Sequence, residues 1–257
     1  MLALLSPAKK LDMDTSAPTD RFTAPHFTNA SLELNGILRE MSSEDLQDLM
    51  GISENLGREN HERNQAFRLP FNLNNAKQAA WAFRGDTYVG LDADTLKKDD
   101  YDYLADHIMI LSGLYGILRP FDLMMAYRLE MGTRLKTERG KNLYEFWGNE
   151  LTDFVNDSLK DHKDKTVINL ASKEYISAIS EDALTGGMVT PEFKELKDGK
   201  PKMIGIYAKR ARGMMARYMI DNKVETVEAL KSFDMGGYQF QPQASDDKTL
   251  VFLRDQN

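Results

Sequence analysis

The sequence predicts a mixed α/β (α+β) fold for one domain that spans residues 1–257. Short runs of apolar or β-branched residues, such as 1–5 and 166–170, are typical of buried strands. Longer runs between them place apolar residues at helical spacing, as over 144–159. Strands that alternate with helices indicate a sheet covered by helices. No internal repeat, linker or low-complexity segment divides the chain.

The first expected strand, over residues 1–5, ends in a polar loop. Pro7 cannot donate a hydrogen bond to a neighbouring strand, so the ladder stops before it. Lys9 follows in the loop, and loops at strand ends often carry binding residues. Lys9 is therefore a candidate binding residue, and the alternative is an exposed loop lysine. Residues 12–27 have the composition of a surface loop, and 28–83 are predicted to be mainly helical.

A glycine-rich turn follows an apolar run with helical spacing over 101–111. Gly113 and Gly116 bracket this turn, and a second helical run begins near Asp122. Two helices joined in this way have the layout of a helix-hairpin-helix element, whose hairpin amides can hold a DNA phosphate. Three cations follow nearby, namely Arg119, Arg128 and Arg134. The alternative is a tight turn between two helices, with no binding role.

The rest of the chain is expected to continue the alternation of strands and helices. The expected elements are a strand at 87–89, a helix at 144–159, strands at 166–170, 188–196 and 202–207, helices at 208–220 and 224–230, and a closing hairpin near 236–252. The short strand 166–170 is rich in β-branched residues, and Ser172 behind it can cap a helix.

The segment 207–220 has the strongest charge pattern in the chain. On a helical wheel its methionines and tyrosines gather on one face, while its cations share the opposite arc. These cations are Lys209, Arg210, Arg212 and Arg217, and the segment 205–220 contains no acidic residue. Such a helix can bind an anion, and the alternative is a solvated face on a helix packed against the core.

Several polar residues fall where strands are expected to end, which could bring them together at one edge of a sheet. Among them Lys9, Asn169 and Lys209 are candidates for catalysis, because a lysine near a carboxylate can act as a base or form a Schiff base. The sequence contains no complete catalytic triad, phosphate-binding loop, dinucleotide fingerprint or zinc signature. Cysteine is absent and the four histidines lack metal-site spacing, so neither a metal nor a cofactor is expected.

Composition limits the partners and the compartment. The net charge of −7 argues against a protein coated in nucleic acid, but local basic segments allow a polyanion to bind at one patch. No apolar run reaches 18 residues, so no membrane-spanning helix is expected. The first residues do not have the pattern of a secretory signal, and the chain has no cysteine for disulfides. A cytoplasmic monomer is therefore expected.

Six stretches distributed along the chain resemble the peroxide stress protein YaaA family, a bacterial cytoplasmic family. They are SPAKKLD at 6–12, FRGDTYVGL at 83–91, LSGLYGILRPFDLMMAYRLEMG at 111–132, LYEFWG at 143–148, VINLASKEY at 167–175 and YAKRARGMMARYMI at 207–220. The stretches are long and cover nearly the whole chain. Lys10 stands where Thr is common in the family and Arg84 where Lys is common, and both changes keep or add positive charge.

The resemblance implies one domain of unusual fold with a helix-hairpin-helix element and a positively charged groove. It implies binding of double-stranded DNA, with a preference for distorted or branched forms. It also implies a role in the response to hydrogen peroxide, in which the protein limits free intracellular iron and oxidative damage. At matching positions the hairpin is Gly113 and Gly116, and the groove candidates are Lys9, Arg128, Lys209, Arg210, Arg212 and Arg217. The alternative is an enzyme that acts on DNA or a nucleotide-like ligand at a Lys-centred site.

Overall fold

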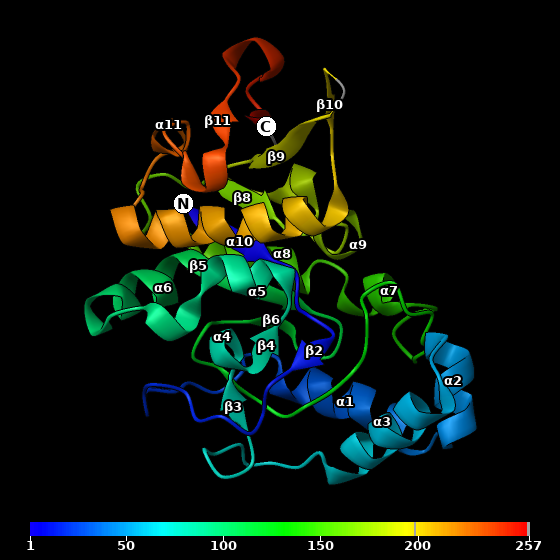
Figure 1. Cartoon of the computed structure of the whole chain (residues 1–257). Helices are drawn as coiled ribbons and strands as arrows, with labels where there is room; N and C mark the ends of the chain where they lie inside the picture. Colours follow the sequence, from blue (N-terminus) through cyan, green and yellow to red (C-terminus); the bar gives the residue numbers. More distant parts are fainter. Residues whose placement is uncertain (198, 256–257) are drawn as a thin grey trace.

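A twisted sheet of eight strands runs through the computed structural model, which describes residues 1–197 and 199–255 (Figure 1). In their order across the sheet, the strands are β11 (Gln239–Phe240), β12 (Thr249–Asp255), β9 (Met188–Lys197), β8 (Val167–Leu170), β1 (Leu2–Leu5), β5 (Ile108–Ser112) and β6 (Gly116–Leu118), and β10 (Lys200–Lys202) pairs with β9. The neighbours from β12 to β5 run parallel, whereas β6, β10 and β11 are antiparallel to their partners. The predicted mixed α/β class is confirmed.

The first strand, β1, lies in the middle of this sheet. Leu5 is level with Ile110 of β5 on one side and with Leu170 of β8 on the other. All four residues of β1 are buried and apolar, because parallel strands are covered on both faces. The strands predicted at 1–5 and 166–170 are therefore confirmed within one or two residues.

The connections that leave β1 and β8 run in opposite directions across the sheet. After β1 the next strand of this sheet is β5, which pairs with β1 on the side away from β8. After β8 the next strand is β9, which pairs with β8 on the side away from β1. Adjacent parallel strands with this property define a topological switch point, and their carboxyl ends leave a crevice between the outgoing loops. The loops after Leu5 and Leu170 therefore border the expected ligand position in this sheet.

Helices cover the sheet and form a lobe beside it (Figure 1). The helices are α1 (Thr28–Arg39), α2 (Ser43–Met50), α3 (Glu54–Ala66), α4 (Ala79–Ala82), α5 (Asp86–Leu91), α6 (Tyr101–His107), α7 (Leu143–Trp147), α8 (Glu150–Ser158), α9 (Lys173–Ile176), α10 (Gly205–Asn222) and α11 (Val227–Leu230), with short 3-10 turns η1 (Ala93–Thr95), η2 (Lys98–Asp100), η3 (Glu181–Ala183), η4 (Met235–Gly237) and η5 (Pro242–Ala244). Two small sheets pair β2 (Lys10–Leu11) with β4 (Phe83–Arg84) and β3 (Lys77–Gln78) with β7 (Leu123–Met124). The α1–α3 lobe lies at the lower right of Figure 1.

Two glycines bring α5 and α10 into backbone contact. A Cβ atom on Gly213 would lie 1.7 Å from the carbonyl oxygen of Thr87. A Cβ atom on Gly90 would lie 2.1 Å from the carbonyl oxygen of Arg210. Because neither glycine carries a side chain, the two helices lie closer together than they could with a larger residue at either position. This close crossing sets the position of α10 relative to the loops at the switch point.

The predicted helix-hairpin-helix over 111–134 is wrong. The helical pattern ends at His107, and residues 108–112 form β5, which pairs with β1 and with β6. The apolar run 101–111 combined the end of a helix with a fully buried strand, and periodicity cannot separate the two in so short a run. Gly113 and Gly116 thus shape a β-hairpin, and the second helix expected from Asp122 is replaced by the short strand β7.

The hairpin glycines are needed for packing. Gly116 has a φ of +68°, and a Cβ atom there would lie 2.7 Å from Cδ2 of Leu151. A Cβ atom on Gly113 would lie 2.2 Å from the carbonyl oxygen of Leu129. Leu114 and Tyr115 between them are fully buried, so the hairpin amides do not face a surface that DNA could reach.

Other expected elements change in kind or in length. The expected strand at 87–89 lies inside α5. The expected helix 144–159 is two helices, α7 and α8, that meet at Gly148 with a φ of +49°. The expected strand 202–207 overlaps the observed strand β10 at Lys202 alone, because α10 already begins at Gly205.

Candidate functional site

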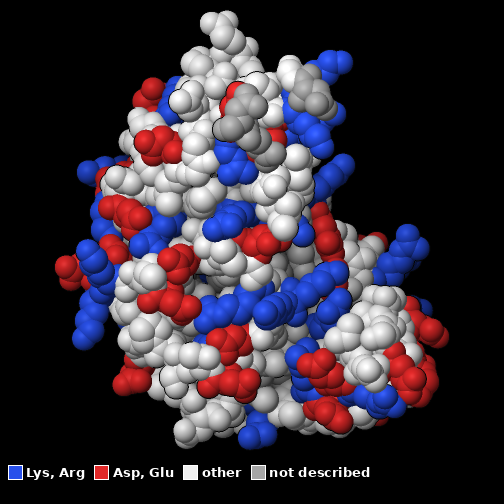
Figure 2. All heavy atoms as spheres, viewed as in Figure 1, with Lys and Arg blue, Asp and Glu red and all other residues white. Residues whose placement is uncertain are grey.

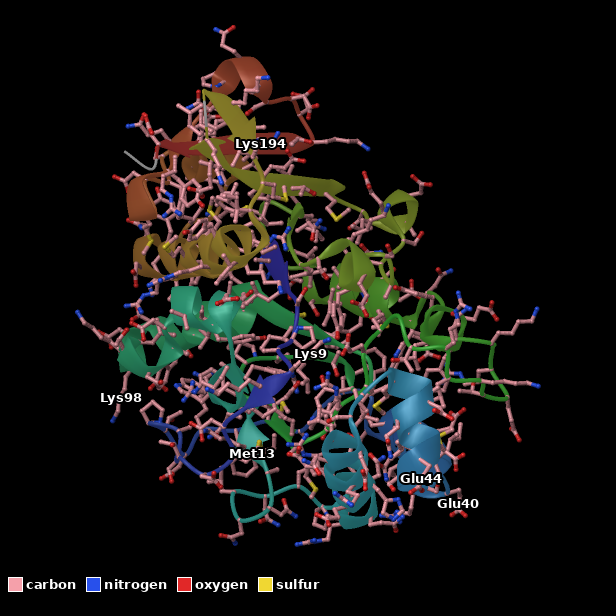
Figure 3. All side chains as sticks on the ribbon, turned by 45° about the vertical axis from the view of Figure 1, so that its right-hand side comes forward. Lys9, Met13, Glu40, Glu44, Lys98 and Lys194 are labelled. Atoms are coloured by element: carbon pink, nitrogen blue, oxygen red, sulfur yellow. The ribbon has the colours of Figure 1, made fainter. Side chains whose placement is uncertain are left out.

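A hollow of about 480 Å³ opens at the switch point and is here called the first hollow. Five segments line it: residues 6–10 after β1, 84–88 at the start of α5, 127–130, 170–175 after β8, and Lys209 with Arg212 on α10. Loops behind parallel strands meet at the carboxyl edge of a sheet, so residues far apart in the sequence converge there. Figure 3 shows Lys9 near the middle of the molecule, between β1 and β2.

Hydrogen bonds join the loop after β1 to the neighbouring strand and helix. The hydroxyl Oγ of Ser6 accepts a hydrogen bond of 2.8 Å from the backbone N–H of Ser172. The hydroxyl of Tyr88 on α5 donates a 3.0 Å bond to the carbonyl oxygen of Ser6. Burial raises the pKa of Tyr88 well above its usual value, so the phenol stays neutral and keeps this proton. The floor of the hollow is therefore fixed before any ligand arrives.

Cations outnumber carboxylates among the lining residues. The six cations are Lys9, Lys10, Arg84, Arg128, Lys209 and Arg212, and the three acids are Asp86, Glu130 and Glu174. Glu130 Oε1 lies 2.8 Å from Nζ of Lys9 and 3.6 Å from Nη2 of Arg128. Arg84 pairs outside the hollow with Asp12 at 3.0 Å and with Asp94 at 3.3 Å. The lining is thus positive in sum, although some of its charge is already neutralised.

Arg128 and Arg212 combine burial with incomplete pairing, whereas Lys10 and Lys209 are exposed, and Lys9 and Arg84 form closer ion pairs. The side chain of Arg128 is 16% exposed, and its buried Nε has no hydrogen-bond partner. Arg212 is half-buried, and burial lowers the pKa of its guanidinium. Within residues 1–197 and 199–255, the Arg212 side chain forms neither an ion pair nor a hydrogen bond. A buried donor without a partner, such as Nε of Arg128, usually has a ligand or water as a partner.

A second hollow of about 530 Å³ adjoins the first and shares Arg128, Glu130 and Glu174 with it. Its other lining residues come from the end of α2, at 48–50, and from 132–134. The two hollows together are here called the groove, which extends from α10 to the α1–α3 lobe. Figure 2 shows a band of Lys and Arg side chains across the middle of this face, with Asp and Glu above and below it.

Other site types have little support in the described ranges 1–197 and 199–255. No helix there is both long and apolar enough to cross a membrane. No group of three His, Asp or Glu side chains there is arranged to hold a metal ion. The 18-residue helix α10 shows why length alone is not enough, because it contains the four cations Lys209, Arg210, Arg212 and Arg217.

A family model described as "Peroxide stress protein YaaA" matches residues 1–244 of the chain. The chain belongs to the peroxide stress protein YaaA family. A "UPF0246 protein" of Shewanella amazonensis is 47% identical over 256 residues, and one of Saccharophagus degradans is 49% identical over 256 residues. Both alignments cover 100% of this chain and 100% of the relative. The family description associates this protein with peroxide stress, and all groove residues lie inside the matched range.

In this YaaA family protein, the structure brings together five of the predicted cations. Lys9, Arg128, Lys209 and Arg212 line the first hollow, and Arg134 lines the second. Their convergence follows from the sheet order and from the position of α10 above it. The ion pair between Arg128 and Glu130 also shows that these two residues face the same side of the chain.

The remaining predicted arginines lie outside the groove. Arg119 binds the buried carboxylate of Asp122 at 2.9 Å and so has a packing role. Arg217 bonds Asp221 at 2.8 Å and Oγ1 of Thr95 at 2.6 Å, which ties α10 to the η1 turn. Arg210 is exposed but does not line either hollow. The helical wheel placed Arg210 and Arg217 on one arc with Lys209 but could not show which part of that arc faces the groove.

Asn169 and the two hairpin glycines also do not line the groove. The side chain of Asn169 donates a 3.2 Å bond to Oγ1 of Thr190 and accepts a 3.0 Å bond from the N–H of Ala171. These bonds hold the end of β8, and Asn169 is not among the residues that line the hollow. Gly113 and Gly116 are buried in the β5–β6 hairpin.

Sequence reasoning missed several lining residues. Arg84 reaches the hollow because β4 pairs with β2, and Lys10 is level with Arg84 in that pairing. Glu174 reaches it from α9, where its Oε1 accepts a 2.9 Å bond from the N–H of Gly132. The charged turn at 84–86 was the available signal for the first of these, but neither two-residue strand had a pattern that predicts pairing.

Proposed function

We propose that this YaaA family protein binds double-stranded DNA through the groove as part of the response to hydrogen peroxide. The observation that carries the proposal is the convergence of cations from separate segments on one groove of a chain with net charge −7. An acidic body repels a polyanion everywhere except at such a patch, so binding is confined to the groove. The proposed partner is duplex DNA, with a preference for distorted or branched forms, and the protein acts as a monomer.

The proposed cellular role is to limit free intracellular iron and the oxidative damage that iron promotes. The family description supports the link to peroxide stress. The groove supports the DNA part of the role, because phosphate contacts need cations and no base-specific geometry. Together they support the proposal of a cytoplasmic protein that binds DNA when peroxide is present.

The alternative enzyme with a Lys-centred site has less support from the geometry. Amine chemistry requires a lysine whose charged form is destabilised by burial or by a neighbouring cation. The side chain of Lys9 is 63% exposed and pairs with Glu130 at 2.8 Å, so it is neither buried nor placed against another cation there. Lys9 therefore suits a phosphate contact better than a catalytic amine.

Gel-shift binding to duplex, single-stranded and four-way junction DNA tests the proposal. Lys209→Glu places a negative charge in the groove and should weaken binding at least tenfold, while the salt dependence becomes shallower by about one unit of slope. Lys98→Glu is the control, because Lys98 is equally exposed but lies far from Lys9, at the left edge of Figure 3. Equal loss in both variants, or salt-independent binding, would contradict the groove. Product analysis on the same samples detects any DNA chemistry.

A further inference from the structure

Two guanidinium groups in the first hollow lack the partners that a buried cation normally has. Nε of Arg128 is inaccessible and unbonded, and the Glu130 carboxylate 3.6 Å from its Nη2 is closer to Lys9. Arg212 faces the same hollow without an ion pair or side-chain hydrogen bond among the described residues. Removing Nε of Arg128 from water without a partner costs free energy, and the half-buried charge of Arg212 is only partly solvated. An anion bound by both guanidinium groups would offset that cost.

The rest of the hollow suits a flat, weakly polar group. Tyr88 and Tyr127 line it, and each side chain is at least nine-tenths buried. Their hydroxyls are already used, by the carbonyl oxygen of Ser6 and by Oγ of Ser112, so both residues offer ring surface rather than donors. Leu129 adds further apolar lining. A ligand with one anionic end and one planar end would match these two halves.

Size and position narrow the class of ligand. A hollow of about 480 Å³ lies within the usual range of roughly 300–1,000 Å³ for small-ligand sites, and is far too small for a duplex. It also lies at the carboxyl ends of β1 and β8, at the switch point where α/β sheets bind ligands. A mononucleotide combines the required anion, planar group and size.

We propose that the first hollow binds one nucleoside monophosphate unit, with its phosphate on Arg128 and Arg212 and its base against the tyrosine floor. The unit is either a free mononucleotide or an unpaired nucleotide exposed in distorted DNA. For the DNA source the inference rests on the proposed function, and it would explain why distorted DNA is preferred. The free source does not depend on duplex binding.

Calorimetric titration tests the pocket with three probes: deoxyadenosine monophosphate, deoxyadenosine and inorganic phosphate. The monophosphate should bind, and each of the other two should bind at least tenfold more weakly. Arg212→Gln should weaken monophosphate binding at least tenfold, because it removes a charge-assisted contact. Arg210→Gln, two residues away on α10 but outside both hollows, should change it less than twofold. Equal losses in the two variants, or equal affinity for the nucleoside and its monophosphate, would overturn the pocket.

Arg212→Lys guards against loss of folding. It keeps the charge but loses the planar guanidinium, so binding should fall to a value between those of the parent and Arg212→Gln. Melting temperatures of all variants are measured alongside. If Arg212→Lys folds but binds the monophosphate no better than Arg212→Gln, the Arg210→Gln control decides. Parent-like binding by Arg210→Gln then supports the pocket, and weakened binding overturns it.

Two closed dumbbell duplexes distinguish the sources, one fully paired and one with a single unpaired nucleotide. If the nucleotide enters from DNA, deoxyadenosine monophosphate competes with the unpaired dumbbell and not with the paired one. Monophosphate binding without binding of either dumbbell supports the pocket and overturns the proposed DNA function. Binding of the paired dumbbell without any monophosphate binding supports the DNA function and overturns the pocket.

Discussion

Glu130 is the carboxylate that would compete most directly with a phosphate in the groove. Its Oε1 lies 2.8 Å from Nζ of Lys9 and 3.6 Å from Nη2 of Arg128, and it borders both hollows. Glu130→Gln removes the negative charge and frees both cations. We expect duplex affinity to rise about three- to tenfold, in line with the removal of one partly exposed repulsive charge.

Glu228→Gln is the matched control for that gain. Glu228 also pairs with a lysine, Lys231, at 2.5 Å, but neither residue lines the groove. Both variants change the net charge by the same amount, so a gain caused only by net charge would appear in both. An unchanged affinity in Glu130→Gln would mean that Glu130 does not face the bound anion.

Asp12 links stability to pH. Hydrogen bonding from the backbone N–H of Thr15, with help from Lys77 and Arg84, holds the pKa of this carboxyl well below its usual range. A lowered pKa in the folded state means that the stabilisation is complete above the unfolded pKa, near pH 4, and is lost as the pH falls below it. Asp12→Asn should therefore cost about 2 kcal/mol at pH 7 and less at pH 3.

Urea unfolding of the parent and of Asp12→Asn at both pH values measures this difference. The gap between the two proteins should narrow on acidification, because at pH 3 the unfolded parent binds a proton at Asp12 while the folded parent, with its lowered pKa, does not. Lys77 is the main source of the cost, since its side chain is 6% exposed and lies 3.4 Å from Asp12. A gap that is equal at both pH values would show that the charge on Asp12 is unimportant.

The sequence could predict single lining residues of the site, at a strand end and on a charged helix. Lys9 follows the first strand, and Lys209 and Arg212 belong to a charged helix, so pattern alone selects them. The incomplete pairing of Arg128 and Arg212 could not be predicted, because pairing depends on which carboxylates fold next to them. Arg217 illustrates this limit: it shares α10 with Arg212 but is neutralised by Asp221.

At the scale of elements, the crossing of α5 and α10 supports the site. Gly213→Ala would place a Cβ atom 1.7 Å from the carbonyl oxygen of Thr87, so α10 must move away. We expect a loss of about 1–3 kcal/mol in the free energy of unfolding, typical of overpacking. Because Arg212 is the preceding residue, nucleotide and DNA binding should also weaken in the folded fraction.

Gly36→Ala is the control for this prediction. Gly36 lies inside α1, and a Cβ atom there meets nothing within 4 Å. Alanine in an exposed helix interior should be neutral or stabilise by about 0.5–1 kcal/mol. Chemical denaturation of both variants separates the two effects, and a Gly213→Ala protein as stable as Gly36→Ala would refute the close crossing.

Elements with a clear pattern were predicted well, and elements at a change of pattern were not. The buried strand expected at 166–170 is β8, at Val167–Leu170. The run 101–111 was misread because α6 leads directly into β5 without a turn residue between His107 and Ile108. A helix-period run and a buried strand both consist of apolar residues, so only the pairing of β5 with β1 separates them.

At the scale of the whole molecule, the order of the strands could not be predicted from the sequence. The alternation of helices and strands predicted the fold class, but it contains no information on which strands are neighbours. The switch point exists because β8 pairs with one edge of β1 and β5 pairs with the opposite edge. The groove depends on that return, because it brings residues 170–175 next to 6–10.

The central position of β1 also has a consequence for synthesis. Leu5 leaves the ribosome well before its partners Ile110 and Leu170, which follow it by more than a hundred residues. Until then four adjacent apolar residues have no sheet to enter, and contacts so distant in sequence form slowly. A nascent chain of this protein must therefore keep its first strand from aggregating through most of translation, which makes it a natural client for chaperones that bind emerging apolar segments.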